Sequence, residues 1–310
     1  MTKRMIGSSG IKVAKLALGG NVFGWTADET ASFAILDAFV DAGGTMIDTA
    51  DGYSAWAPGN KGGESETIIG KWLKQPGKRA RVVIATKVGF MGGLAPDTIA
   101  SACNASLARL GIETIDLYYQ HKDDETVPLA DSLGAIDALV KAGKVRAIGL
   151  SNFTAPRIAE ALHAAHHAGL TIPSAYQGWY NMLERQKFEG AISAVVLDQG
   201  LAMFPFYGLA NGFLTGKYRS QDDLGKSVRG LRNVEYFEGK GPTVLAALDE
   251  VSRDSGASLA AIALAWTMAQ PGITAPIASA TSLAQVEEQV AALTLTLTPA
   301  QIELLDRASE

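Results

Sequence analysis

The chain has 310 residues, of which 47% are hydrophobic and 19% are charged, and its net charge is −5. This size allows one large α/β domain or two smaller ones, and the slight acidity argues against nucleic acid or an anionic membrane as the main partner. The only cysteine, Cys103, excludes an intramolecular disulfide and is typical of a reducing compartment. The segment MTKRMIGSSG lacks the apolar core of a signal peptide, and no stretch is apolar for long enough to span a bilayer, so we expect a cytoplasmic location.

Short apolar runs alternate along the chain with stretches whose apolar residues recur at helical spacing. A hairpin is expected first, over residues 4–13, around a Gly-Ser-Ser-Gly turn. The expected strands that follow are 15–18, 45–47, 82–86, 115–120, 145–150, 174–177, 201–206 and 273–278. Helices are expected over 30–42, from Pro96 to Leu110, and over 129–142, 156–168, 189–199, 244–255 and 259–270, with a terminal helix after Thr298. Residues 217–241 are expected to form a long polar loop.

Eight strand-like segments that alternate with helices in this length favour a closed (β/α)8 TIM barrel over an open doubly wound sheet. An open sheet usually carries a GxGxxG fingerprint after its first strand, and Gly19-Gly20-Asn21 lacks that spacing. No shift in composition marks a linker. We therefore expect residues 1–310 to form a single barrel domain, with the N-terminal hairpin closing the bottom and a helix at the C-terminus.

Three of the expected strands end in an ionisable residue. Asp48, Lys87 and His121 each follow an apolar run, and Tyr53 lies in the loop after Asp48. A carboxylate at a buried strand end needs a cation beside it, for which Lys87 is the candidate. Because the loops after the strand C-termini form one face of such a barrel, these four side chains are expected to meet there.

Together the four side chains suit proton transfer to a developing alkoxide. A lysine ammonium is expected to lower the pKa of a neighbouring tyrosine from about 10, and Asp48 would keep Lys87 charged. His121 could donate a hydrogen bond to a substrate oxygen or help to relay its proton. Since no side chain donates hydride, carbonyl reduction at this site requires a nicotinamide cofactor.

From about Lys12 to the last helix, the chain resembles the aldo-keto reductases. The similar segments are IDTADGY with the following GGESETIIGKWL, then ATKVG, DLYYQH, KVRAIGLSNF, GLANGFLTGKY and IASATSLAQVEEQ. The resemblance implies reversible, NAD(P)H-dependent reduction of an aldehyde or ketone to an alcohol. It also implies a catalytic tetrad of Asp48, Tyr53, Lys87 and His121, with Tyr53 as the general acid and NADP(H) extended across the barrel mouth.

The same resemblance implies a set of cofactor-binding residues. Gly20 and Asn21 belong to it, and Ser151, Asn152 and Gln177 would hydrogen-bond the nicotinamide carboxamide. Phe206 stands where the family usually stacks a tyrosine on the nicotinamide ring, and Tyr207 follows it. The segment around the pyrophosphate would comprise Leu209, Asn211, Gly212, Leu214, Gly216 and Lys217. The adenosine end would be surrounded by Ser279, Ala280, Thr281, Ser282, Gln285 and Gln289.

One departure from the family concerns the choice between NADP(H) and NAD(H). The arginine that usually meets the 2′-phosphate is absent from Ala278-Ser279-Ala280-Thr281. The cation is then expected from the long loop, with Lys217, Arg219, Arg229 and Arg232 as candidates. NAD(H) is therefore not excluded by the sequence.

The substrate is expected to be a small carbonyl compound or alcohol, in a pocket walled by Phe23, Trp25, Trp56 and Phe90. These residues favour an apolar substrate, although sugars also stack on tryptophan. Two rival functions are an NADP(H)-binding redox sensor or auxiliary subunit with little turnover, and an isomerase or aldolase that uses Lys87 as a Schiff-base amine. No metal site is expected, because His163, His166 and His167 lack a carboxylate or cysteine at ligand spacing. The oligomeric state is left open.

Overall fold

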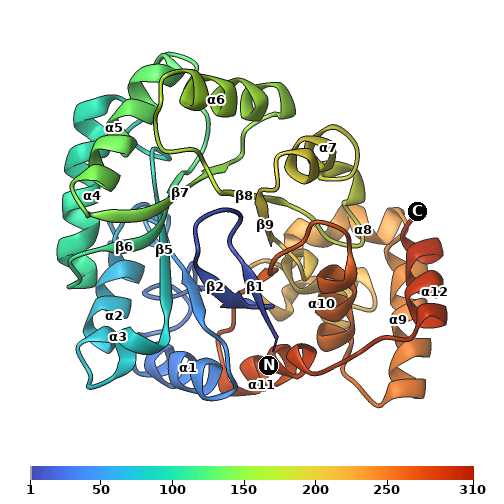
Figure 1. Ribbon diagram of the computed structural model, residues 1–310. Helices are drawn as coiled ribbons and strands as arrows, with labels where there is room; N and C mark the ends of the chain where they lie inside the picture. Colours follow the sequence, from blue (N-terminus) through green and yellow to red (C-terminus); the bar gives the residue numbers. More distant parts are fainter. Residues whose placement is uncertain (1) are drawn as a thin grey trace.

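The computed structural model describes residues 2–310. Eight parallel strands form a nearly closed barrel surrounded by helices (Figure 1), which confirms the expected (β/α)8 fold. In their order around the sheet, the strands are β10 (Ile277–Ala278), β3 (Ala17–Gly19), β4 (Met46–Asp48), β5 (Val83–Val88), β6 (Ile115–Gln120), β7 (Val145–Ser151), β8 (Ala175–Trp179) and β9 (Ala202–Phe206).

The barrel closes between β9 and β10 through few backbone contacts. A single bridge pairs Met203 with Ile273, and the amide of Thr274 donates to the carbonyl of Met203 at 2.8 Å. The expected strand over 273–278 is therefore shorter than predicted, because only Ile277 and Ala278 pair with β3. Pro276 lies between these two contacts, and proline has no amide hydrogen to donate to a ladder.

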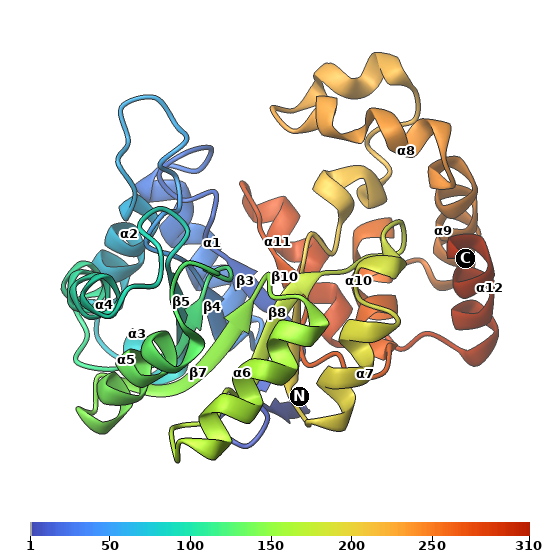
Figure 2. The same cartoon turned by 90° about the horizontal axis from the view of Figure 1, so that it is seen from above.

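The N-terminal hairpin covers one end of the barrel, the lower end in Figure 2. It consists of β1 (Lys3–Met5) paired antiparallel with β2 (Lys12–Ala14). Ile6, Ile11 and Val13 are buried there and belong to one apolar cluster with side chains from the barrel strands, among them Ala17, Met46, Ala85, Leu117, Tyr119 and Phe204. The hairpin thus closes the bottom of the barrel and leaves the opposite end to the functional loops.

The outer layer consists of helices, most of which bury an apolar face against the strands or against a neighbouring helix. Their bounds are α1 (Glu29–Asp41), α2 (Glu64–Leu73), α3 (Lys78–Arg81), α4 (Pro96–Leu110), α5 (Leu129–Lys141), α6 (Ala155–His167), α7 (Ala191–Asp198), α8 (Val234–Glu238), α9 (Gly241–Ser255), α10 (Leu259–Ala269), α11 (Leu283–Val290) and α12 (Pro299–Ser309). Cys103 is buried on the inner face of α4. The C-terminal helix α12 begins at a capping box formed by Thr298 and Gln301, and it packs against α9. Within residues 2–310, none of these helices has the length and apolar character that crossing a membrane requires.

The sequence predicted a long loop over residues 217–241, but this segment is not irregular. It contains two 3₁₀ helices, η3 (Gln221–Lys226) and η4 (Gly230–Asn233), followed by α8. Leu224 and Asn233 are buried within this polar segment, which hydrophobic periodicity alone does not reveal. The segment, coloured orange, stands at the top of Figure 2, at the end of the barrel opposite the hairpin. The other 3₁₀ helices are η1 (Arg185–Lys187), η2 (Ala210–Thr215) and η5 (Ala291–Leu293).

Candidate active site

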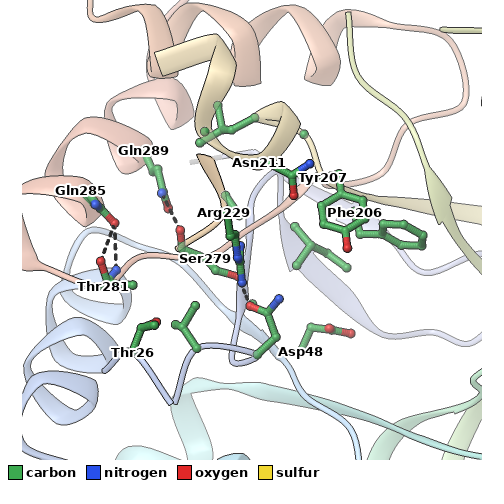
Figure 3. A pocket seen from close by; sticks show the side chains of 18 of the residues that line it. Thr26, Asp48, Phe206, Tyr207, Asn211, Arg229, Ser279, Thr281, Gln285 and Gln289 are labelled. Atoms are coloured by element: carbon green, nitrogen blue, oxygen red, sulfur yellow. Dashed lines mark hydrogen bonds between the residues drawn. The ribbon is translucent and has the colours of Figure 1, made fainter. Parts of the chain in front are cut away.

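A cavity of about 960 Å³ opens at the end of the barrel opposite the hairpin. Its walls come from the loops after the strand C-termini and from the segment that contains η3 and η4. Tyr53 and His121 line one part of it, and Thr281 and Gln289 line another. Figure 3 shows how side chains from the two ends of the chain face this space.

Asp48, Lys87 and Tyr53 meet as the sequence predicts. The Nζ of Lys87 lies 2.7 Å from Oδ2 of Asp48 and 2.9 Å from the phenol oxygen of Tyr53. It also donates to the backbone carbonyl of Thr49 at 2.8 Å. The other oxygen of Asp48 accepts a hydrogen bond from Nε2 of Gln177 at 2.8 Å. The buried carboxylate is therefore paired and hydrogen-bonded on both sides, as a buried charge requires.

The register between β4 and β5 explains why Asp48 and Lys87 form an ion pair. Asp48 is the last residue of β4 and pairs with Ala85 of β5. Because side chains alternate along a strand, Lys87 points to the same face as Ala85, one step nearer the mouth. The loop after β4 then carries Tyr53 to the ammonium, and the hydroxyl of Ser54 anchors that loop by donating to the carbonyl of Phe23 at 2.7 Å.

The pKa of Tyr53 departs from the expectation. Burial raises this pKa well above its usual range, and the nearby carboxylate of Asp48 adds to the effect. Burial lowers the pKa of Lys87, while Asp48 opposes that change. Burial and Asp48 outweigh the stabilisation of the phenolate by Lys87, because Asp48 at 2.7 Å offsets the charge of the ammonium. The phenol therefore keeps its proton at neutral pH, which suits a general acid.

His121 lies beside Tyr53, with ring centroids 5.9 Å apart. Burial lowers the pKa of this histidine to about 2, and the positive charges of Lys87 and Lys122 act in the same direction. Its imidazole is therefore neutral and carries one N–H that can donate a hydrogen bond. Its Nδ1 is buried without a hydrogen-bond partner among the described residues.

Most of the expected cofactor-binding residues line the cavity. These are Asn21, Asn152, Gln177, Phe206, Tyr207, Leu209, Asn211, Gly212, Lys217, Ser279, Thr281, Gln285 and Gln289. The others do not line the cavity: Gly20, Ser151, Leu214, Gly216, Ala280 and Ser282. Ser282 still shapes the site, because its hydroxyl caps the first turn of α11.

The backbone between β9 and η2 is folded for close approach to a ligand. Tyr207, Ala210, Asn211 and Gly212 all have positive φ, at 58°, 47°, 54° and 89°. Such runs are costly for residues other than glycine and cluster at ligand sites. A Cβ on Gly212 would lie 2.8 Å from Nζ of Lys217, so the missing side chain leaves space for that ammonium.

Hydrogen bonds fix the conformation of the loop after β10, which lines the part of the cavity expected to hold the adenosine. The amide of Thr281 donates to Oε1 of Gln285 at 2.9 Å, and Nε2 of Gln289 donates to the carbonyl of Ser279 at 3.0 Å (Figure 3). The hydroxyl of Ser279 donates to Oδ1 of Asn21 at 2.6 Å. The loop after β10 is thus tied both to α11 and to the loop after β3.

The structure separates the four cations proposed for the phosphates. Arg219 forms a two-armed ion pair with Asp249, at 2.7 and 2.9 Å, so its charge is already paired. Arg232 lines a smaller neighbouring cavity of about 170 Å³. Lys217 and Arg229 line the main cavity, and neither forms a salt bridge within residues 2–310. Burial lowers the pKa of Arg229, which leaves a half-buried guanidinium in need of an anion.

The aromatic walls are only partly those expected. Trp56 and Phe90 line the cavity, whereas Phe23 is fully buried and Trp25 packs edge-on behind Trp56, with ring centroids 5.6 Å apart. Sequence reasoning missed several lining residues, namely Thr26, Trp179, Lys226, Val228 and Glu288. Trp179 could have been found, because it lies two residues after the predicted strand over 174–177. The others lie on loops or on a helix face whose approach to the cavity depends on tertiary packing.

No three His, Cys, Asp or Glu side chains of residues 2–310 lie together as a metal site would need. His163 and His167 meet edge to face on one helix, with ring centroids 5.6 Å apart. Both are exposed on the surface of α6, away from the cavity lining.

Comparison with known proteins yields one family. The family model described as "Aldo/keto reductase family" matches residues 15–310. Aldo-keto reductase str7 of Strobilurus tenacellus is 32% identical over 98% of this chain and 88% of its own. Aldo-keto reductase yakc of Schizosaccharomyces pombe, whose name adds NADP(+), is 30% identical over 91% and 83%. A probable voltage-gated potassium channel subunit beta of Oryza sativa subsp. japonica is 29% identical over 99% and 96%. The chain therefore belongs to the aldo/keto reductase family.

Proposed function

We propose that this protein is an NAD(P)H-dependent reductase that converts an aldehyde or ketone to an alcohol, with Tyr53 as the general acid. The observation that carries the proposal is the contact at 2.9 Å between the phenol of Tyr53 and the ammonium of Lys87, at the wall of a large cavity. The family and its oxidoreductase members support the reaction class.

The cavity suits an extended dinucleotide. The positive-φ segment that ends at Gly212 allows a close approach of the backbone, and Lys217 and Arg229 supply positive charge for phosphates. The hydrogen-bonded loop around Ser279 and Gln285 would hold the adenosine end, and Phe206 or Tyr207 would cover the nicotinamide. When bound, a reduced nicotinamide supplies a hydride, that is, one proton and two electrons, to the carbonyl carbon.

The residues of the chain supply the proton. Tyr53 transfers its phenolic proton to the carbonyl oxygen, so that the C=O double bond becomes an alcohol as the carbon accepts the hydride. Lys87 stabilises the resulting phenolate at 2.9 Å, and Asp48 holds the ammonium in position. The neutral His121 donates a hydrogen bond to the same oxygen. The phenolate then recovers its proton from solvent.

The test of Tyr53 as the proton donor removes its phenol oxygen. Tyr53→Phe removes the hydroxyl and keeps the ring, so kcat for reduction of a carbonyl panel should fall by at least about 100-fold. Binding of NADPH, followed by cofactor fluorescence, should change little. A variant that keeps near-normal kcat would show that Tyr53 is not the proton donor.

We propose NADP(H) as the cofactor, with NAD(H) as the rival. The cations that line the cavity and the NADP(+) in the name of the Schizosaccharomyces pombe relative favour NADP(H). Parallel titrations with NADPH and NADH decide between the two. Equal or tighter binding of NADH would reject the preference.

A second candidate function is an NADP(H)-binding auxiliary subunit with little turnover. It is favoured by the relative named as a probable potassium channel subunit beta. Tight binding of NADPH without steady-state consumption over a wide carbonyl panel would support it. A Schiff-base enzyme is disfavoured, because all three bonds from Nζ of Lys87 go to Asp48, Thr49 and Tyr53.

A further inference from the structure

The proposed proton donor lies in the middle of a continuous row of aromatic rings. Along this row, the centroid distances are 5.6 Å from Trp25 to Trp56, 6.1 Å from Trp56 to Tyr53, 5.9 Å from Tyr53 to His121 and 5.0 Å from His121 to Phe90. We call these five side chains the aromatic row. Four of them line the cavity, with Trp25 behind Trp56. A carbonyl that accepts the proton of Tyr53 is therefore flanked by apolar ring surface on both sides.

A second aromatic group comes from the strands β8 and β9. The ring of Trp179 lies 4.7 Å from that of Tyr207 and 6.2 Å from that of Phe206. All three line the same cavity as Tyr53. The loops after β4 and β5 and the ends of β8 and β9 thus all contribute flat apolar surface.

The polar side chains beside Tyr53 have little capacity left for substrate hydroxyl groups. Nδ2 of Asn152 donates to the carbonyl of His121 at 2.9 Å and to Oγ of Ser151 at 3.1 Å. Gln177 donates to Asp48, whose second oxygen is held by Lys87. Apart from the cations that we assign to phosphates, the buried polar atoms of the lining that have no partner within residues 2–310 are Nδ1 of His121, Nε1 of Trp179 and Oδ1 of Asn211. Most hydroxyl groups of a polyol would therefore give up water here without a replacement hydrogen bond.

The row also ends in exposed apolar surface at the mouth. The exposed fractions of Trp56 and Phe90 are 50% and 53%, and those of Met91 and Val228 are 65% and 72%. Val228, from the segment between η3 and η4, lines the cavity as well. Large apolar side chains that gather at the rim of a cavity mark a surface that a ligand covers.

We propose that the substrate is an aldehyde or ketone carried by a flat apolar body, such as an aryl or fused-ring carbonyl compound, and not a sugar, with Trp56 and Phe90 as specificity-determining residues. This inference rests on the proposed reductase function. The carbonyl oxygen meets Tyr53 and His121, and the apolar body extends along the row towards Trp56 and Phe90. The redox step is the one given above, with the hydride on carbon and the phenolic proton on oxygen.

The experiment compares kcat/KM for 2-naphthaldehyde, benzaldehyde, propanal, D-glyceraldehyde and D-xylose with the full chain and NADPH. We expect 2-naphthaldehyde to exceed D-glyceraldehyde by at least about 100-fold. Trp56→Ala and Phe90→Ala should each lower the ratio of 2-naphthaldehyde to propanal by about tenfold. Ile172→Ala is the matched control, because Ile172 is 46% exposed and lies outside the cavity lining. It should leave the ratio unchanged.

If an alanine variant does not fold, Trp56→Leu and Phe90→Leu remove the ring face and keep apolar bulk. A preference for D-glyceraldehyde or D-xylose would overturn the substrate class and leave the reductase function standing. Unchanged ratios in both folded variants would also overturn it. Absence of turnover with every carbonyl would reject the reductase function itself, and the substrate class with it.

Discussion

The ammonium of Lys87 lies 2.9 Å from the phenol oxygen of Tyr53 and 2.7 Å from the carboxylate of Asp48. Because the ammonium and the carboxylate carry opposite charges, the tyrosine faces an ion pair whose net charge is close to zero. Burial then controls the tyrosine pKa and raises it. The arrangement keeps the proton on Tyr53 until an alkoxide develops, and the ammonium stabilises the phenolate once that proton has left.

The first prediction concerns the pH dependence of reduction. Since burial lowers the pKa of His121 to about 2, this imidazole should stay neutral over the whole working range. The profile of kcat/KM above about pH 5 should therefore have the same shape in the wild type and in His121→Gln, although the variant is slower. Steady-state kinetics at constant ionic strength test this. A step near the usual histidine pKa that disappears in the variant would contradict it.

Arg229 and Arg219 form a matched pair for testing cofactor binding. Arg229 lines the cavity without a salt bridge in the described part of the chain, whereas Arg219 is held by Asp249. Loss of a charge-assisted hydrogen bond to phosphate should raise the Kd for NADPH by about 10- to 100-fold in Arg229→Ala. Arg219→Ala should change it by less than about threefold. Equal losses in both variants would show that the effect is only electrostatic background.

Asp51 should make the protein less stable as the pH rises. Burial raises the pKa of this carboxyl from 3.8 to about 6, the neighbouring Glu66 adds to the shift, and Oδ1 has no partner among residues 2–310. The folded state therefore binds more protons than the unfolded state between these values. The stabilisation is complete below pH 3.8 and is lost as the pH rises through about 6.

The test is the free energy of unfolding of the wild type and Asp51→Asn as a function of pH. The variant cannot ionise at this position, so its advantage over the wild type should grow on the order of 1–3 kcal/mol between about pH 4 and pH 8. Parallel curves for the two proteins would reject the shifted pKa of Asp51.

Two helical glycines should respond oppositely to alanine. A Cβ on Gly70 would lie 2.1 Å from the carbonyl oxygen of Arg109, so that α2 and α4 could not keep their present distance. A Cβ on Gly134, in α5, meets nothing within 4 Å. Gly70→Ala should destabilise the protein by about 1–3 kcal/mol, and Gly134→Ala should stabilise it by about 0.5–1 kcal/mol. Thermal denaturation midpoints measure both, and a raised midpoint for Gly70→Ala would refute the close packing.

Much of the fold could be predicted because its strands are short, apolar and regularly spaced. Asp48 and His121 were recognisable as ionisable groups at strand ends, and the structure brings both to the cavity. Phe23 was assigned to the pocket by the same reasoning, yet it is fully buried, because position in a loop does not determine which way a side chain points. The short helices η3 and η4 carried no periodic signal, so the sequence offered Arg229 only as one of four candidate cations and did not reveal that Val228 lines the cavity.

By itself, the sequence determined the alternation of strands and helices, the hairpin and the identities of Tyr53 and the three side chains around it. These features depend on local patterns, which neighbouring residues impose. Only the tertiary structure decided that Arg229 lines the cavity while Arg219 is paired with Asp249, that Trp179 shares a wall with Tyr207, and that the tyrosine pKa rises. Each of these outcomes depends on distances between groups far apart in the chain and on their burial, and neither is encoded in any one segment.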